Sequence, residues 1–171
     1  MSRFQGLRQV VSQVLIRTSA YYRPEFMRRI NHSTAGRVIL ESFVNASAEK
    51  KIFLQNWEIQ LFAVALGFAK RKKEALGDIN AGGGIDFDTF KASGVWPGFI
   101  YSLSLVEKES PDVLCSNDDR DEYRIKLFEQ YAEGGFTQIA ADGVQEMDVI
   151  SFADYVIKLA DKPLEESPPQ P

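Results

Sequence analysis

The segment "NWEIQLFAVALGF", residues 56–68, is the most apolar stretch of this 171-residue chain. Its apolar side chains follow helical spacing on two sides. One side holds Trp57, Leu61, Val64, Ala65 and Phe68, and the other holds Ile59, Phe62 and Leu66. A helix that is apolar all round is usually buried at the centre of a domain. The segment therefore predicts a mainly α-helical domain built around residues 56–68.

Helical periodicity recurs on both sides of this segment and predicts a single-domain helical bundle. The predicted helices cover about 1–18, a stretch opening at Pro24, Ser33 or Thr34 to Val44, 56–68, Pro97 to about Lys108, Asn117 or Asp118 to about Glu133, and about 147–160. We divide the chain into an amphipathic arm, 1–44, a core, 45–161, and a proline-rich disordered tail, 162–171.

Two details of the bundle can be checked against a structure. Gly134–Gly135 predicts that the preceding helix ends at Ala132 or Glu133 through a left-handed glycine. The last helix offers an apolar face made of Val149, Ile150, Ala153, Val156, Ile157 and Ala160. We expect six side chains to be buried together: Trp57, Leu61, Phe62, Leu66, Phe128 and Ile150.

Charge is distributed unevenly along the chain. The first 40 residues contain seven arginines and one acidic residue, Glu25. The remaining 131 residues carry 13 of the 20 basic and 23 of the 24 acidic side chains. A basic head on an acidic body indicates a partner for the head, which is nucleic acid, an acidic protein surface or the chain's own body.

The predicted arm carries an apolar stripe beside its arginines. Phe4, Leu7, Val11 and Val14 repeat at helical spacing, and this stripe is our predicted partner-binding site. The basic side chains are candidate contacts to a DNA backbone. They are Arg3, Arg8, Arg17, Arg28 and Arg29 near the start, and Lys70, Arg71, Lys72 and Lys73 after the central helix. Arginines on the polar face of a helix that docks on an acidic partner explain the same pattern.

The stretch "DINAGGGIDFDTF", residues 78–90, has the outline of an EF-hand calcium loop. Such a loop needs oxygen ligands at positions 1, 3, 5, 9 and 12 and a glycine at position 6. Positions 1, 3, 6 and 9 hold Asp78, Asn80, Gly83 and Asp86. Position 5 is Gly82, and position 12 is Thr89 where a bidentate glutamate belongs. We therefore expect a connector and no metal site, with an EF-hand-like calcium protein as the least favoured alternative.

Other chemistry has few candidates in this sequence. His32 is the only histidine and Cys115 the only cysteine, so a zinc site lacks ligands and a cytoplasmic location is expected. "DDRDE", residues 118–122, is typical of an acidic helix start more than of a magnesium site. No run of 18 apolar residues predicts a membrane span. We expect no catalytic residues and no cofactor.

Two segments resemble small proteins encoded beside bacterial DNA phosphorothioation clusters, the Dnd system-associated family. The first resemblance rests on Phe62, Ala63, Ala65, Leu66 and Gly67, followed by the basic turn. The second rests on Phe128, Glu129, Tyr131, Ala132, Gly134 and Gly135, with Glu133 where the family has asparagine. It covers about residues 50–145.

The resemblance implies an accessory subunit of an anti-phage or DNA-modification complex. Its expected partner is a larger nuclease or ATPase subunit of the same operon, with possible DNA contact. The alternative is a stand-alone DNA-binding or regulatory protein.

Overall fold

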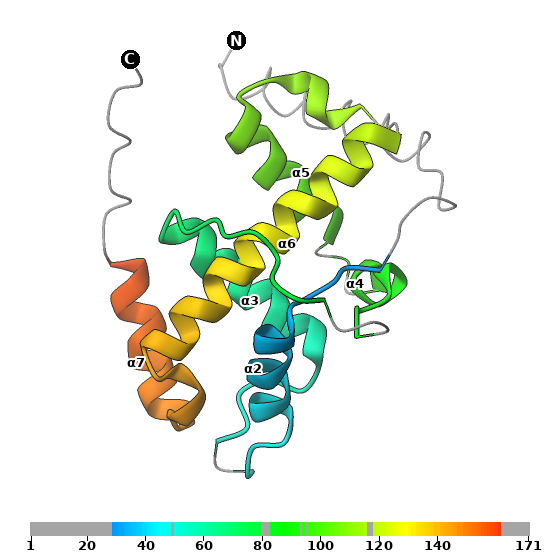
Figure 1. The fold of residues 1–171 in the computed structure, drawn as a ribbon. Coiled ribbons are helices and arrows are strands. Elements are labelled where there is room, and N and C mark those ends of the chain that lie inside the picture. Colours follow the sequence, from blue (N-terminus) through cyan, green and yellow to red (C-terminus); the bar gives the residue numbers. More distant parts are fainter. Residues whose placement is uncertain are drawn as a thin grey trace. The chain divides into compact units, whose positions relative to one another are not determined.

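The computed structural model describes residues 29–48, 50–79, 83–92, 94, 96–115 and 118–161. Over these residues the protein is mainly α-helical, which confirms the predicted fold class (Figure 1). Residue contacts divide the chain into two units. Unit 1 contains residues 1–29 and 86–128, and unit 2 contains residues 30–85 and 129–171.

Unit 2 is built from four helical segments. They are α2 (Thr34–Val44), α3 (Asn56–Ala69), residues 129–141 of α6 (Asp118–Ala141) and α7 (Val149–Ala160), with the short 3-10 helix η3 (Val144–Glu146) before α7. Ser33 caps α2 as predicted, because its hydroxyl oxygen accepts a hydrogen bond from the Gly36 N–H at 2.9 Å. Residues 34–44, which were grouped with the arm, pack against α3.

An aromatic cluster joins three of these helices. The Phe53 ring lies between Phe43 of α2 and Phe62 of α3, with centroid distances of 5.4 and 5.5 Å. Phe152 of α7 contacts both Phe53 and Phe62, at 5.5 and 5.2 Å. Edge-to-face pairs of this kind add stability beyond the area that they bury. Phe152 is therefore the main apolar anchor of α7.

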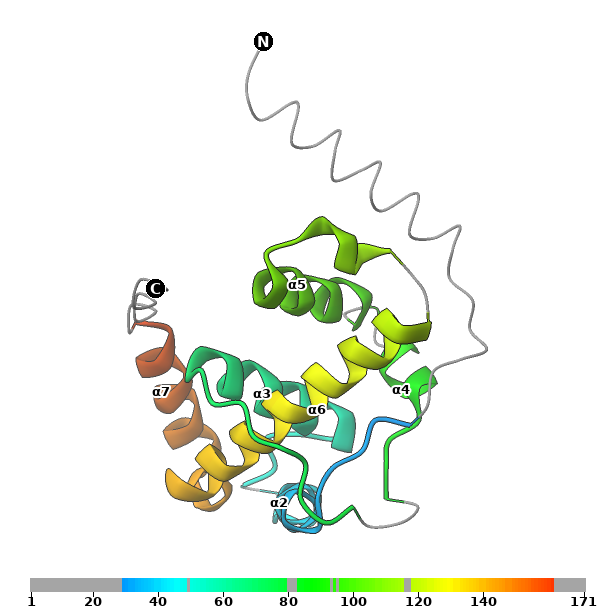
Figure 2. The same cartoon turned by 45° about the horizontal axis from the view of Figure 1, so that its top comes forward.

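Glycines allow α3 and α6 to cross at close range in unit 2 (Figure 2). A Cβ atom added to Gly135 would lie 1.8 Å from the Ala63 carbonyl oxygen, and one added to Gly67 would lie 2.1 Å from the Tyr131 carbonyl oxygen. Both obstacles are backbone atoms, so neither can rotate away. Gly36 of α2 is similarly restricted, because an added Cβ would lie 2.8 Å from the Phe136 ring.

The predicted helix end at Ala132 or Glu133 is wrong. α6 continues from Asp118 to Ala141, and neither Gly134 nor Gly135 is among the glycines with positive φ. The helix passes through the glycine pair because the pair removes side chains from its contact surface. The left-handed glycine lies later, at Gly143, with φ 64°.

Unit 1 contains α4 (Phe87–Ala92), α5 (Trp96–Lys108), the 3-10 helix η2 (Pro111–Leu114) and residues 118–128 of α6. Phe128 is fully buried in this unit, with the Phe90 and Phe99 rings at 5.7 and 6.3 Å. α5 confirms the helix predicted from Pro97 to Lys108, and α6 begins at the predicted Asp118.

A buried arginine connects the elements of unit 1. Arg124 is 1% exposed, and its guanidinium donates hydrogen bonds to the Val113 carbonyl oxygen and the Asp121 carboxylate. A longer hydrogen bond, 3.4 Å, reaches the Cys115 carbonyl oxygen. The guanidinium carbon also lies 4.7 Å from the centre of the Tyr101 ring. One α6 side chain thus holds the connection after α5 in place.

The expectation that Ile150 is buried with the central helix is wrong, because 75% of its surface is exposed. α7 meets unit 2 through a different side, on which Phe152, Tyr155 and Leu159 are half-buried. The Tyr155 hydroxyl donates a hydrogen bond of 2.7 Å to the Asp142 carboxylate. Of the other residues in the expected cluster, Leu66 and Phe128 are buried, and Trp57, Leu61 and Phe62 are half-buried.

Among the helices of the described residues, none is both long and apolar enough to cross a membrane.

Candidate functional site

The basic segment Lys70–Lys73 follows the end of α3 and forms a tight helix cap. The Arg71 N–H donates to the Phe68 carbonyl oxygen at 3.0 Å, and the Lys72 N–H donates to the Gly67 carbonyl oxygen at 2.8 Å. These two bonds define a Schellman cap, in which the residue corresponding to Arg71 adopts a left-handed conformation. Arg71 does so with φ 51°. Glycine is the usual residue at such a position because it has no Cβ.

The basic segment then runs across α6 (Figure 1). A Cβ added to Gly134 would lie 1.9 Å from the Lys72 carbonyl oxygen, so the second glycine of the pair makes room for this backbone. The Glu74 N–H donates to the Gln130 carbonyl oxygen at 3.1 Å, and the Glu74 carboxylate accepts from the Thr137 hydroxyl at 2.7 Å. α6 therefore fixes the position of the basic segment.

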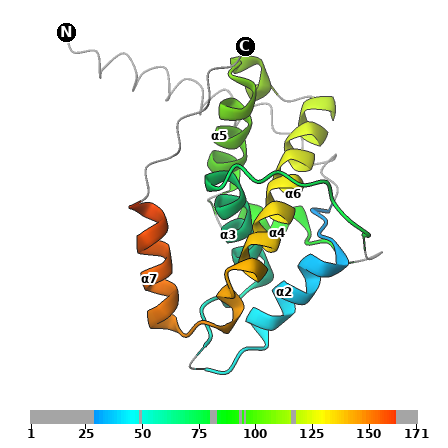
Figure 3. The same ribbon diagram turned by 60° about the vertical axis from the view of Figure 1, so that its left-hand side comes forward.

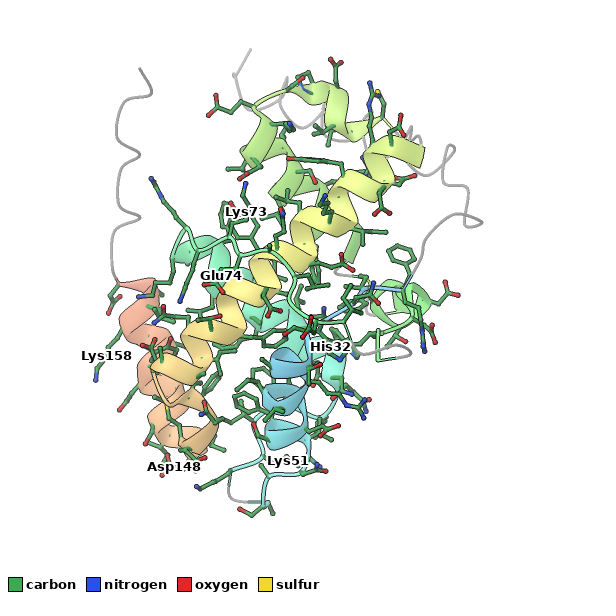
Figure 4. The ribbon with its side chains drawn as sticks, in the orientation of Figure 1. His32, Lys51, Lys73, Glu74, Asp148 and Lys158 are labelled. Carbon is green, nitrogen blue, oxygen red and sulfur yellow. The ribbon has the colours of Figure 1, made fainter. Side chains whose placement is uncertain are left out.

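The side chains of the basic segment extend over the same surface. Lys70, Arg71 and Lys73 are exposed, whereas Lys72 is half-buried and lies 3.5 Å from the Glu74 carboxylate. The Lys73 ammonium lies 5.8 Å from the centre of the Tyr131 ring (Figure 4). Three exposed basic residues on a fixed backbone form a surface suited to phosphate groups.

The remaining predicted nucleic-acid contacts are only partly accessible to this description. Arg29 forms a salt bridge with Asp86 in unit 1, with Nε 2.7 Å from the carboxylate. The carboxylate thereby raises the pKa of Arg29, and the guanidinium lowers the pKa of Asp86. Arg3, Arg8, Arg17 and Arg28 lie outside the described residues, as do Phe4, Leu7, Val11 and Val14 of the predicted partner-binding stripe.

The glycine-rich stretch is a connector in its described part. Antiparallel bridges pair Ile79 with Ser33 and Ile85 with Ile30 in unit 2. The Asp78 carbonyl oxygen accepts from the Thr34 N–H at 3.0 Å, and the Asp78 side chain is exposed. Asn80 and Gly82 lie outside the described residues. Within the described part of the chain, no group of three or more His, Cys, Asp or Glu side chains is arranged to hold a metal ion.

The single histidine and the single cysteine occupy ordinary structural positions. His32 is 4% exposed at the start of α2, and burial, with a smaller effect from Arg37, lowers its pKa (Figure 4). Cys115 is exposed. Two polar positions of the resembling motif have structural partners that sequence patterns did not reveal. Glu129 is buried and accepts from the Asn31 N–H at 2.7 Å, and Gly134 makes room for Lys72.

Comparison with known proteins identifies a family. The family model described as DNA sulphur modification system-associated protein 4 matches residues 29–158. The match includes the α3–α6 crossing, the basic segment and α7, and it extends beyond the region of resemblance at both ends. Neither the curated proteins nor the solved structures contain a match. Because the family model covers most of the chain, this protein belongs to the family of DNA sulphur modification system-associated protein 4.

Proposed function

We propose that the protein is a non-catalytic, cytoplasmic accessory subunit of a bacterial DNA-modification and anti-phage defence complex. In this role it bridges a larger nuclease or ATPase subunit of the same operon through the apolar stripe of the arm. The basic segment holds the DNA backbone. Association of the family with DNA sulphur modification systems supports this assignment.

Arg71 is the observation that carries the DNA-contact part of the proposal. A left-handed conformation costs an ordinary side chain about 1–2 kcal/mol relative to glycine. The chain nevertheless places an arginine there, between Lys70 and Lys72. An unfavourable backbone conformation that persists at one residue is a reason to infer a function for its side chain. Here the side chain would bind phosphate.

We expect Arg71→Gly to separate stability from binding. Glycine relieves the left-handed strain but increases the entropy of the unfolded chain, so the free energy of unfolding should rise by about 0.5–1 kcal/mol. The complex should retain DNA more weakly, and the slope of log affinity against log salt should become shallower by about one. Urea denaturation and DNA binding at several salt concentrations measure the two effects.

Glu109→Gly is the matched control for this variant. Glu109 also has φ 51°, but it follows α5 in unit 1 and carries the opposite charge. This variant should gain similar stability and leave DNA retention unchanged. If Arg71→Gly retains DNA as well as the parent does, the basic segment is not a DNA contact.

The bridging role depends on the arm and has its own test. Leu7→Asp combined with Val11→Asp should abolish copurification with the larger subunit, because charges within an apolar contact are strongly disfavoured. Residues 45–160 should remain folded by circular dichroism. Arg8→Glu combined with Arg28→Glu should instead weaken DNA retention. If the aspartate variants copurify normally and only the glutamate variants fail, the arm is a DNA contact. The stand-alone DNA-binding alternative would then be favoured.

A further inference from the structure

α7 contains a seven-residue repeat that the packing of unit 2 does not explain. Residues 149–154 read VISFAD, and residues 156–161 read VIKLAD. Valine, isoleucine, alanine and aspartate recur at intervals of seven, and Phe152 and Leu159 form a further apolar pair. A seven-residue apolar repeat is typical of a helix that packs along a second helix.

Only one side of this repeat is used within unit 2. Phe152, Tyr155 and Leu159 are half-buried, and no residue of α7 is fully buried. The opposite apolar residues are exposed: Val149 by 49%, Ile150 by 75%, Val156 by 37% and Ile157 by 58%. Together with the exposed Ala153 and Ala160 they form what we call the α7 apolar face. α7 lies at the edge of unit 2, where a partner can approach it (Figure 3).

The shape of the α7 apolar face fits a helix. Val149, Ala153, Val156 and Ala160 are separated by four, three and four residues, which places them in one row along α7. Small alanines alternate with larger valines in this row, so side chains of a second helix can insert between them. Exposed apolar patches of this kind mark interaction sites on soluble proteins.

Charge beside the α7 apolar face indicates the chemistry of the occupant. Asp154 and Asp161 follow Ile150 and Ile157 by four residues, and neighbours at this spacing share one edge of a helix. Both aspartates are exposed. Lys158 and Ser151 lie toward the polar side, and Lys158 points outward from α7 (Figure 4). A helix seated on this face would therefore meet acidic side chains along the isoleucine edge.

A second copy of α7 is a poor occupant. A two-fold interface brings the same surface of both copies together, so the aspartate edge of one copy would face that of the other. Like charges placed opposite each other oppose association. A helix with an apolar row and basic residues beside it has the complementary charge instead.

We propose that the α7 apolar face binds a basic amphipathic helix from another protein of the DNA sulphur modification system. The identity of the system in which the occupant is found rests on the proposed function. The chemistry of the occupant rests on the α7 repeat and its aspartates. α7 is thus a protein-docking surface separate in sequence from both the arm and the basic segment.

Site-specific photo-crosslinking in the full chain tests this proposal. A photoreactive phenylalanine analogue replaces Ile157, the chain is produced together with the other proteins of its operon, and crosslinked peptides are sequenced by mass spectrometry. The same substitution at Ser151, on the polar side, is the matched control. We expect Ile157 to crosslink to a segment of another protein with an apolar helical repeat and several lysines or arginines. Adding Asp154→Lys and Asp161→Lys should lower that yield about tenfold or more.

Four results would overturn the inference. They are a crosslink within the same chain, a crosslink to a second copy in a mixture of light and heavy chains, a crosslink to a segment without basic residues, and a yield at Ile157 no higher than at Ser151. If the parent chain copurifies with an operon protein but one of these results is obtained, only the α7 inference fails. If it copurifies with none, the proposed function fails as well.

Discussion

Replacing Gly135 with alanine is expected to lower the free energy of unfolding by about 3 kcal/mol, since inserting atoms into a tight contact typically costs about 1–3 kcal/mol and occasionally more. The new Cβ would lie 1.8 Å from the carbonyl oxygen of Ala63 and 2.8 Å from its Cα. These are backbone atoms of α3, so the two helices must move apart. Urea denaturation followed by circular dichroism measures the loss.

Gly98→Ala is the matched control for Gly135→Ala. Gly98 lies in α5, and no atom lies within 4 Å of an added Cβ at this position. Alanine should therefore stabilise the helix by about 0.5–1 kcal/mol through its higher helix propensity. Two substitutions of glycine by alanine in helices would then have opposite signs.

A double variant makes this prediction more specific. Gly67 lies at the same crossing, where an added Cβ would be 2.1 Å from the Tyr131 carbonyl oxygen and 3.0 Å from Gly135 N. Once one alanine has separated α3 from α6, the second meets less obstruction. Gly67→Ala with Gly135→Ala should therefore cost less than the sum of the single losses. Additive losses, or a stable Gly135→Ala variant, would contradict the tight crossing.

Replacing Arg124 with leucine is expected to lower the free energy of unfolding by about 3–5 kcal/mol, the usual effect of removing one partner of a buried ion pair. The variant removes the guanidinium from the buried Asp121 carboxylate. It also removes a donor from the Val113 carbonyl oxygen and the cation from the Tyr101 ring. Urea denaturation measures this loss too.

Arg37→Leu serves as the comparison for Arg124→Leu. Arg37 bonds to Glu41 one helical turn away at 2.7 Å, but the two side chains are 44% and 54% exposed. Exposed pairs at this spacing contribute about 0.3–0.5 kcal/mol, so this variant should be nearly neutral. Adding Asp121→Asn to Arg124→Leu should recover part of the loss by removing the buried negative charge. Equal losses for Arg37→Leu and Arg124→Leu would contradict the assigned role of Arg124.

Most helices could be predicted because their causes are local. Apolar spacing places α3 over nearly the predicted residues 56–68, and the Ser33 hydroxyl marks the start of α2 by bonding to an N–H three residues away. The basic segment after α3 could likewise be located from four consecutive charges. Its left-handed arginine could not, because no residue type announces that conformation when glycine is absent.

The glycine pair shows where local reasoning ends. Glycine is favoured both where a helix turns left-handed and where a helix must approach another backbone closely. The sequence around Gly134 and Gly135 is compatible with either use. Only the positions of Ala63 and Lys72, more than 60 residues earlier, decide that α6 continues.

The sequence by itself determined that the protein is helical, that residues 56–68 form its central helix, and that basic residues follow that helix. These features arise from side-chain periodicity, capping and charge within a few turns. The tertiary structure alone decided which side of α7 packs on unit 2 and that Arg124 is buried. The apolar arc of α7 is wider than one contact can cover, so the aromatic partners Phe53 and Phe62 select the side that holds Phe152. Burial of a charge depends on partners that folding brings to it, which neighbouring residues cannot specify.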